Sequence, residues 1–360
     1  MNDPRPSRIT GVRPLWAVEG ARLTVLGEGF SLEPLPDIKV GGASARLASA
    51  SPHALNVTVP PGLDGGRTSI RIDTAPGETA YVEVGAPLAT GLHQVDNPAF
   101  DHDGNLYVTF SGSRGQDSPV SVFKVRRDGS REPFISGIPN PTSLAFDAEG
   151  RLHISSRFDG TVYRIDDEGT PVVVASDLGV ACGIAFDREG TLFVGDRSGS
   201  ILKMIGGRAT TLTTLPPSIA AFHLAFAPDG DLFVTGPTLG THDCVYRITP
   251  DGQVGIFYDG FGRPQGLAFD ALGRLYVVDA LAGRGGVYRF DSVGQAFEGR
   301  PGGSDTERQP ELLVAAGGLV GLAFNTDGTL AIASSDTVYL LDAGVRGLLP
   351  FGATSVISNQ

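Results

Sequence analysis

Short apolar stretches and polar turns alternate along most of the chain, and six of these units repeat one pattern. The copies read DNPAFDHDGNLYVTF, TSLAFDAEGRLHISS, CGIAFDREGTLFVGD, FHLAFAPDGDLFVTG, QGLAFDALGRLYVVD and VGLAFNTDGTLAIAS. In each copy a small-apolar run ends in Phe, a four-residue polar turn closes with Gly, and an alternating apolar stretch follows. Because alternation with a period of two is typical of β-strands, each copy predicts two strands joined by a tight turn.

The spacing of the copies predicts the architecture of most of the chain. Successive marker phenylalanines lie 46, 40, 40, 43 and 55 residues apart, and they are Phe100, Phe146, Phe186, Phe226, Phe269 and Phe324. Repeats of about 40–50 residues built from four strands are typical of propeller blades, which bury both faces only by stacking in a ring. The sequence therefore predicts a six-bladed β-propeller over residues 87–360.

One repeat can be divided into its four strands, named a to d from the axis outward. We expect strand a at 182–186, strand b at 191–196, strand c at 200–205 and strand d at 209–215. The long fifth spacing is explained by a polar loop at 297–310. A closed ring protects the edges of its first and last blades, so a strand near Pro87–Thr90 is expected to pair with the last blade. The segment LLPF at 348–351 competes for that position.

Residues 1–86 lack the repeat and predict a separate domain. Five short β-rich stretches, ARLTVLG, DIKVGG, ALNVTVP, TSIRID and AYVEVG, are separated by Gly and Pro turns, which is typical of a small β-sandwich. This segment resembles the IPT/TIG immunoglobulin-like family. The matching residues are Pro14, Gly20, Gly27-Glu28-Gly29-Phe30, Val40-Gly41-Gly42, Val59-Pro60 and Gly65-Gly66. The resemblance implies an Ig-like fold and a spacer, binding or dimerisation module, so self-association through this domain is one expectation.

Composition excludes some classes of function. With 28 Lys and Arg against 40 Asp and Glu, the chain has a net charge of −12, which argues against nucleic-acid and anionic-membrane partners. The two cysteines, Cys182 and Cys244, form no disulfide framework or metal-binding spacing. The N-terminal residues lack the apolar core of a signal peptide, so the expectation is a cytoplasmic protein, with export left open if a signal was trimmed.

The second domain resembles the NHL-repeat and gluconolactonase-like six-bladed propellers through its GLAFDxxGxLYVxD pattern. For that group the resemblance implies an axial divalent cation, usually calcium, held by carboxylates and amides. The first acidic ligand falls on Asp96, the two Asn-Gly pairs fall on Thr142-Ser143 and Cys182-Gly183, and the later Asp-Gly falls on Gln265-Gly266. Asp96 is therefore the one metal-ligand candidate, because the other three positions carry neither a carboxylate nor an Asn.

Strand order places the d-to-a and b-to-c loops on one face of the ring, around the mouth of the axial channel. Polar groups that converge at such a mouth are the default ligand site. The ligand-binding candidates on these loops are Asn97, Asn140, Arg157, Asp196, Arg197, Arg263, Gln265 and Asp279. Two alternatives remain open. Asp196 and Asp279 could cap turns, and the arginines could hold a carboxylate or phosphate, or could pair with Asp159, Asp196 and Asp279.

Catalytic candidates are Asp96, His223 and Cys182. His223 occupies a position that is Gly or Ser in other repeats, and it is interpreted either as a channel-lining ligand or base or as a hydrogen-bonded structural histidine. A nucleophilic Cys182 requires a lowered pKa and a neighbouring base such as His223. If a site exists, Asp96, His223 and Gln265 are expected to face one cavity.

Two functions follow from these observations. The first is a binding protein that holds a small molecule or a peptide at the propeller mouth. The second is a metal-dependent lactonase or hydrolase of the gluconolactonase type, with calcium or another divalent cation as cofactor.

Overall fold

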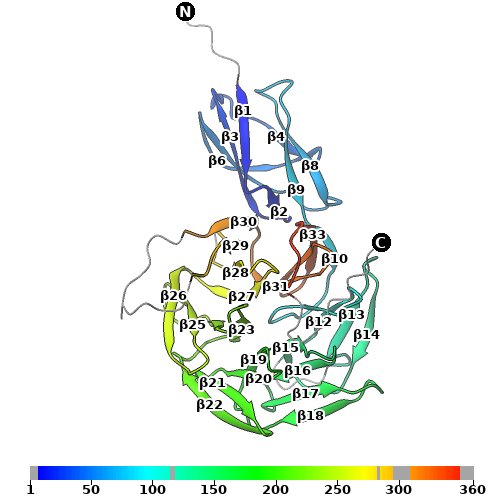
Figure 1. The fold of residues 1–360 in the computed structure, drawn as a ribbon. Helices are drawn as coiled ribbons and strands as arrows, with labels where there is room; N and C mark the ends of the chain where they lie inside the picture. Colours follow the sequence, from blue (N-terminus) through cyan, green and yellow to red (C-terminus); the bar gives the residue numbers. More distant parts are fainter. Residues whose placement is uncertain (1–6, 114–117, 282–283, 295–308, 349–360) are drawn as a thin grey trace, which may run out of the picture.

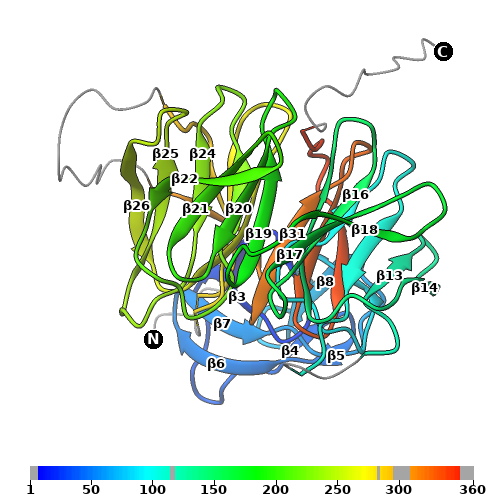
Figure 2. The same ribbon diagram turned by 90° about the horizontal axis from the view of Figure 1, so that it is seen from below.

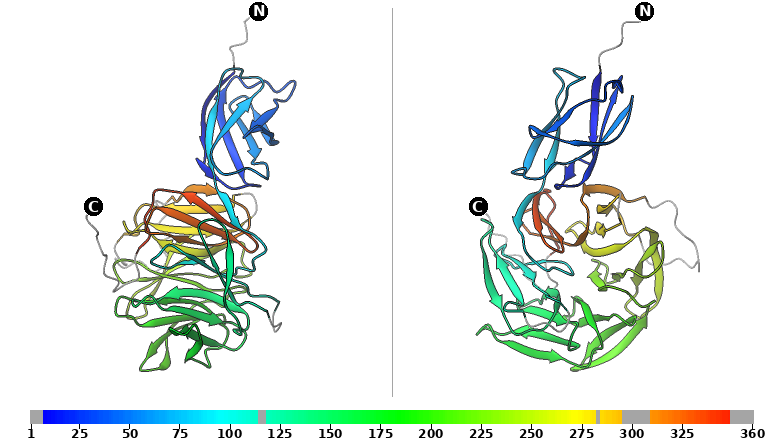
Figure 3. Two further views of the ribbon diagram at one scale, coloured as in Figure 1. Left: turned by 90° about the vertical axis from the view of Figure 1, so that its right-hand side faces the viewer. Right: turned by 180° about the vertical axis from the view of Figure 1, so that it is seen from behind.

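The structure is a computed structural model that describes residues 7–113, 118–281, 284–294 and 309–348. The regular elements of these residues are strands, and none of the described residues forms a helix that could span a membrane. Figure 1 shows a ring of sheets with a smaller domain beyond its perimeter, next to β30 and β33. The edge-on view in Figure 3 shows the same small domain projecting away from the ring rather than over its opening.

The ring contains six four-stranded antiparallel units, as the repeat count predicts. From the axis outward, the first three blades consist of β11 (Ala99–Phe100), β12 (Leu106–Thr109), β13 (Val122–Val125) and β14 (Arg131–Ile135); β15 (Pro141–Phe146), β16 (Leu152–Ser156), β17 (Thr161–Ile165) and β18 (Pro171–Ala175); and β19 (Ala181–Phe186), β20 (Leu192–Asp196), β21 (Ser200–Ile205) and β22 (Arg208–Thr214). The third blade matches its predicted division to within one residue at each strand end. Figure 2 shows these sheets stacked side by side.

The last three blades follow the same order. They consist of β23 (His223–Phe226), β24 (Leu232–Thr235), β25 (Asp243–Ile248) and β26 (Val254–Phe261); β27 (Pro264–Phe269), β28 (Leu275–Asp279), β29 (Gly286–Phe290) and β30 (Glu311–Ala315); and β31 (Leu319–Phe324), β32 (Thr329–Ser334), β33 (Val338–Asp342) and β10 (Ala86–Ala89). The outer strand of the sixth blade thus comes from the start of the propeller segment. Pairing of β10 with β33 confirms the predicted ring closure.

The competing closure segment falls mostly outside the described residues, which end at Leu348. Just before it, Gly347 forms a single bridge with Asp270 in a turn of the fifth blade. Most of the predicted 297–310 loop also lies outside the described residues.

An aromatic contact between neighbouring blades explains why the repeat carries a marker Phe. From the second blade on, the marker ring packs edge-on against the second residue of strand b in the preceding blade. The pairs are Phe146 with Tyr107, Phe186 with His153, Phe226 with Phe193, Phe269 with Phe233, and Phe324 with Tyr276. Such pairs contribute about 0.5–1.5 kcal/mol each beyond their burial, so the repeated sequence encodes the contact between blades as well as each blade.

The Asp that follows the marker Phe forms the a-to-b turn. In the second blade, Oδ1 of Asp147 accepts the backbone N–H groups of Glu149 and Arg151, and Gly150 supplies the positive φ of 78° that closes the turn. Asp101, Asp187 and Asp270 hold their turns with the same side-chain oxygen. The acidic residue of this motif is therefore structural.

Glycine within strand a allows the innermost strands to approach one another. A Cβ on Gly183 would lie 2.3 Å from the carbonyl oxygen of Phe222, and a Cβ on Gly321 would lie 2.6 Å from Cα of Asn97. Neither backbone could tolerate a side chain there. The Gly of the repeat thus brings neighbouring strands together around the axis.

The N-terminal domain consists of two sheets. One contains β1 (Arg8–Arg13), β3 (Arg22–Glu28), β7 (Ala54–Thr58) and β6 (Arg46–Ser51), and the other contains β2 (Trp16–Ala17), β9 (Ala80–Val84), β8 (Gly66–Ile72), β4 (Ile38–Val40) and β5 (Ala43–Ser44). Alternating buried residues from both sheets, such as Leu23, Val57 and Ile70, form its core. This arrangement is the predicted Ig-like sandwich.

One continuous sheet connects the two domains. Strand β2 pairs in parallel with β9 on one side and with β30 of the fifth blade on the other. Ala17 and Ala315 face the core of the sandwich, whereas the adjacent Val18 and Val314 face the core of the propeller. Backbone hydrogen bonds and the packing of both cores therefore join the two domains at this junction.

Candidate functional site

A cavity of about 410 Å³ lies at the mouth of the ring. Its polar wall consists of His93, Gln94, Arg157, Arg197, Gln265 and Ser335. Its apolar wall consists of Val95, Val180, Ile219, Ala220, Ala221 and Val320, and Cys182 completes the lining. All of these residues come from d-to-a segments, starts of strand a or b-to-c loops. The structure therefore places a cavity on the face that strand order predicts.

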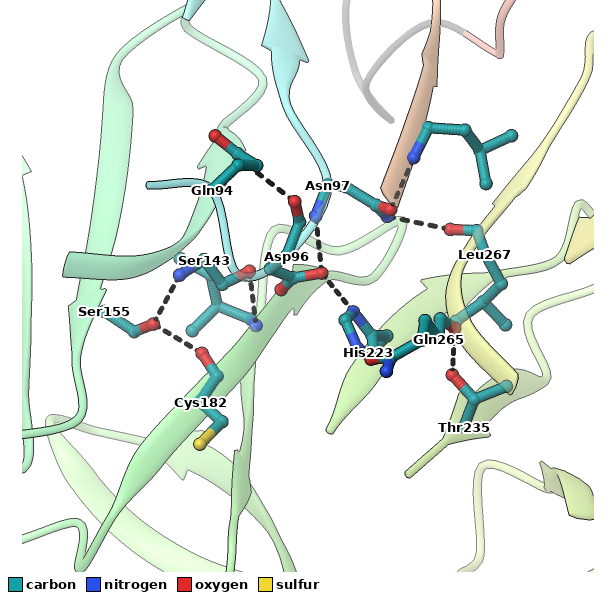
Figure 4. Close-up of polar contacts among 12 residues, drawn as sticks. Gln94, Asp96, Asn97, Ser143, Ser155, Cys182, His223, Thr235, Gln265 and Leu267 are labelled. Carbon is teal, nitrogen blue, oxygen red and sulfur yellow. Dashed lines mark hydrogen bonds and ion pairs between the residues drawn. The ribbon is translucent and has the colours of Figure 1, made fainter. Parts of the chain in front are cut away.

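The cavity lies next to a buried hydrogen-bonded cluster on the axis. Nδ1 of His223 donates to Oδ1 of Asp96, and Nε2 of the same ring lies 3.1 Å from Oε1 of Gln265. Figure 4 shows Asp96 and Gln265 on either side of the imidazole. His223 is fully buried and Asp96 is 2% exposed, whereas Gln265 also lines the cavity. The three residues expected to share one cavity are thus in direct contact, but only Gln265 reaches the lining.

Backbone contacts fix the position of Asp96. Nε2 of the buried Gln94 donates to the carbonyl oxygen of Asp96 at 2.6 Å, and Oε1 of Gln94 accepts the N–H of Thr109 at 2.7 Å. The N–H of Asn97 donates to Oδ1 of Asp96 at 2.6 Å. Together with His223, these bonds hold the carboxylate in one orientation (Figure 4).

Asn97 links three blades rather than lining the cavity. Its Nδ2 donates to the carbonyl oxygen of Leu267 at 2.9 Å, and its Oδ1 accepts the N–H of Leu322 at 3.0 Å. These partners lie in β27 and β31, so the side chain joins the start of the first blade to the fifth and sixth. Both the nitrogen and the oxygen of the Asn97 amide are therefore hydrogen-bonded to backbone groups.

The other amide and acidic candidates also bond to the backbone. Asn140 donates to the carbonyl oxygens of Ser111 and Ser113. Asp196 accepts the N–H of Val180 at 2.8 Å, and Asp279 accepts the N–H of Arg263 at 2.8 Å. Neither carboxylate, nor Asn140 or Asn97, is part of the described cavity lining. Asp196 and Asp279 were interpreted either as ligand-binding residues or as caps of turns. In the structure both side chains cap turns.

Two of the three candidate arginines line the cavity. Arg157 and Arg197 belong to the b-to-c loops of the second and third blades, whereas the exposed Arg263 is not part of the lining. Nε and Nη2 of Arg197 donate to the carbonyl oxygens of Ser218 and Ile219 at 3.2 and 2.6 Å. These bonds hold the guanidinium at the cavity wall.

Cys182 lacks the environment of a nucleophile. Burial raises the pKa of its thiol to about 12, and the charge of Asp96 adds to this effect. Both ring nitrogens of His223 already have Asp96 and Gln265 as partners. A thiol with a raised pKa is almost entirely protonated near neutral pH, so these contacts do not support the hypothesis that Cys182 pairs with His223.

The positions expected to hold calcium do not supply a suitable donor set. Calcium prefers six to eight oxygen ligands, but Asp96 is the single carboxylate at these positions, and it faces the N–H of His223. The hydroxyls of Thr142 and Ser143 bond to the backbone at Asn140 and Ile184. Across the described ranges, no three His, Cys, Asp or Glu side chains are grouped so that they could hold a metal ion.

Sequence reasoning missed His93 and Gln94. Both precede Asp96 in the segment LHQVDNP, and the two-residue spacing of Gln94 and Asp96 was the available signal for a shared location. His93 lines the cavity, and burial together with the charge of Arg157 lowers its pKa.

Comparison with known families and structures agrees with this architecture. The IPT/TIG domain model matches residues 6–83, and the N-terminal part of the chain is an IPT/TIG domain. No match was found among curated proteins. The predicted resemblance to gluconolactonase-like propellers is confirmed at the level of the fold by the structures described next.

Three solved structures illustrate the similarity. An auxiliary nutrient binding protein from Bacteroides thetaiotaomicron has a TM-score of 0.53 and 14% identity, over 94% of this chain and 98% of that one. Regucalcin from Agrobacterium tumefaciens, a calcium-binding protein, has a TM-score of 0.56 and 19% identity, over 74% and 96%. A putative gluconolactonase has a TM-score of 0.56 and 16% identity, over 73% and 92%. At these identities the comparisons establish the fold.

Proposed function

We propose that the protein is a binding protein that holds a small organic ligand in the cavity at the propeller mouth. The observation that carries this proposal is the cavity itself, which combines a convergent polar wall with an apolar wall. A volume of about 410 Å³ lies within the usual range of small-molecule sites, about 300–1,000 Å³. Because Arg197 and Gln265 are already held by protein contacts, little side-chain ordering would accompany binding.

Two further observations support binding over hydrolysis. The axial carboxylate of Asp96 is bonded to His223, and the thiol of Cys182 has a raised pKa, so neither is an activated group. The nutrient binding protein from Bacteroides thetaiotaomicron, which matches 94% of this chain, is an example of this fold in a protein named for binding. The alternative, a calcium-dependent lactonase, has the weaker support because its ligand positions supply one carboxylate, Asp96, which is already bonded to His223.

A blocked mouth tests the proposal. Ser335 is exposed at the rim of the cavity, so Ser335→Trp should fill the opening without disturbing a core. Thr211→Trp, on the exposed outer strand of the third blade, is the matched control. Native mass spectrometry should detect a small molecule on the wild type and on Thr211→Trp but not on Ser335→Trp. Thermal melting with a metabolite library should show the same pattern of stabilisation. Equal stabilisation of all three proteins would contradict binding at the mouth.

A further inference from the structure

The two charged side chains in the described lining of the mouth cavity are both arginines. Arg157 and Arg197 are the charged residues of its described lining, and no Asp or Glu lines it. This is unusual for a chain with a net charge of −12, in which acidic residues outnumber basic ones. A local cationic wall in an acidic protein favours an anionic ligand at that place and disfavours a cationic one.

The carboxylates nearest in sequence to the two arginines accept hydrogen bonds from backbone N–H and hydroxyl groups. Asp159 accepts the N–H of Thr161 and the hydroxyl of Tyr163, at 3.2 and 2.7 Å. Asp196 caps the turn at Val180 and accepts the hydroxyl of Ser198. In the part of the chain that the structure describes, no carboxylate oxygen lies within 4.0 Å of the guanidinium of Arg197.

The guanidinium of Arg197 is oriented with one edge unused. Its Nε and Nη2 donate to the carbonyl oxygens of Ser218 and Ile219, which lie in the segment before β23. Nη1 has no hydrogen-bond partner among the residues of the described ranges, and the side chain lines the cavity. A guanidinium held in this way presents its Nη1–Nη2 edge as a planar pair of donors, which matches the two oxygens of a carboxylate.

The rest of the cavity wall indicates what is attached to the anion. Val95, Val180, Ile219 and Val320 contribute aliphatic surface, and Ala220 and Ala221 extend it. A strongly hydrated inorganic anion would gain nothing from this surface, whereas an organic group would be removed from water by it. Gln265 and Ser335 add neutral hydrogen-bonding groups at the same wall.

We infer that the ligand of the mouth cavity is an organic carboxylate with an apolar body, whose carboxylate binds Arg197 and lies near Arg157. This inference rests on the proposed function of the same cavity and adds the chemical class of the ligand. The carboxylate could belong to a free organic acid or to the C-terminus of a short peptide. Both share the chemistry that Arg197 recognises, and the experiment separates them.

Calorimetric titration with matched pairs tests the inference. Hexanoate is compared with hexanamide, benzoate with benzamide, and an N-acetylated dipeptide with its C-terminal amide; inorganic phosphate is included. We expect at least one carboxylate to bind about tenfold or more tightly than its amide, because a charge-assisted pair is replaced by a neutral contact. Tighter binding by the acids than by the dipeptide identifies a free acid, and the reverse identifies a peptide terminus.

Two arginine variants locate the interaction. Arg197→Gln should weaken carboxylate binding about tenfold or more and leave amide binding unchanged, and Arg197→Lys should be intermediate because it lacks the planar fork. Arg263→Gln removes the same charge from an exposed position outside the lining and should change neither affinity. Unchanged melting temperatures verify that the variants fold.

Three results would overturn the inference. These are equal affinity for acid and amide, phosphate as the tightest ligand, or carboxylate binding that survives Arg197→Gln within about twofold. Failure of every carboxylate, together with an uncharged molecule that binds and is blocked by Ser335→Trp, would refute the carboxylate and leave the proposed function standing. Absence of any bound molecule in titration and mass spectrometry would refute both.

Discussion

His223 and Asp96 form a buried hydrogen bond across the axis of the ring, although 127 residues separate them in sequence. Asp96 precedes the first blade and His223 begins the fourth, so the bond joins blades on opposite sides of a six-membered ring. The other nitrogen of the His223 imidazole, Nε2, contacts the side chain of Gln265 in the fifth blade (Figure 4). A polar contact of this kind connects parts of the propeller that share no sheet.

Removal of Asp96 should therefore destabilise the propeller. Asp96→Ala leaves the Nδ1–H of a fully buried imidazole without its acceptor, and loss of one partner from such a pair costs about 3 kcal/mol. Asp96→Asn retains an acceptor oxygen and should cost less. Urea unfolding followed by fluorescence measures both losses.

Asp103→Ala is the control for this experiment. Asp103 is exposed and pairs only with the exposed His102 among the described residues, so its loss should change stability by less than about 0.5 kcal/mol. Equal effects of the two alanine variants would show that the axial bond contributes nothing to the folded state.

The repeats made the ring predictable because they encode both the strands and the aromatic contact between blades. His223 was also visible in the sequence, since four of the other five repeats have Gly or Ser at its position. Its partners were not fixed by any local pattern, because Asp96 and Gln265 come from other blades. Arg197 shows the same limit: its cavity position depends on the carbonyl oxygens of Ser218 and Ile219, which sequence spacing does not reveal.

Calcium and chelator should leave the melting temperature unchanged. The only carboxylate at the expected ligand positions, Asp96, is bonded to His223, and a cation there would have to replace the imidazole proton or displace the ring. Differential scanning calorimetry with excess EDTA and with calcium, combined with metal analysis of the purified protein, provides the measurement. A stoichiometric metal together with a lower melting temperature in EDTA would instead support the metal-dependent hydrolase.

The two domains should unfold in a single transition. Val18 follows the sandwich residue Ala17 but packs in the propeller core, and its N–H donates to the carbonyl oxygen of Ala315 at 3.1 Å. Because β2 also pairs with β9 and β30, separation of the domains would break one sheet. Calorimetry of the full chain should therefore show one peak.

A pair of core variants checks this coupling. Val18→Ala and Val57→Ala each remove two buried methyl groups, at a cost of about 2 kcal/mol, but Val57 lies wholly in the sandwich core. Both variants should lower the same transition. Two peaks, each shifted by only one of the variants, would establish independent domains.

His153 should make stability fall as the pH decreases below about 6.5. It occupies the strand-b position that is Tyr or Phe in the first, third, fourth and fifth blades, and it packs edge-on against Phe186 at 4.8 Å. Burial lowers the pKa of His153 to about 4, and Arg151 and Arg164 act in the same direction while Asp147 opposes them. The unfolded chain therefore binds one more proton between these pKa values. The stability that the folded protein has with a neutral, buried His153 is fully present above pH 6.5 and is lost as the pH falls toward 4.

Replacement of this histidine by the residue of the equivalent blades tests the sign and the size of the effect. His153→Phe retains the aromatic contact with Phe186 and removes the titrating group. Each pH unit below 6.5 should lower the free energy of unfolding of the wild type by about 1.4 kcal/mol through this group. Between pH 7 and pH 5 the wild type should therefore lose about 2 kcal/mol more stability than the variant. Urea unfolding of both proteins at the two pH values measures this difference, in which the shared titration of the other groups cancels. Parallel pH profiles would mean that His153 has the same pKa in the folded and the unfolded protein, and that its burial between the second and third blades does not keep it neutral.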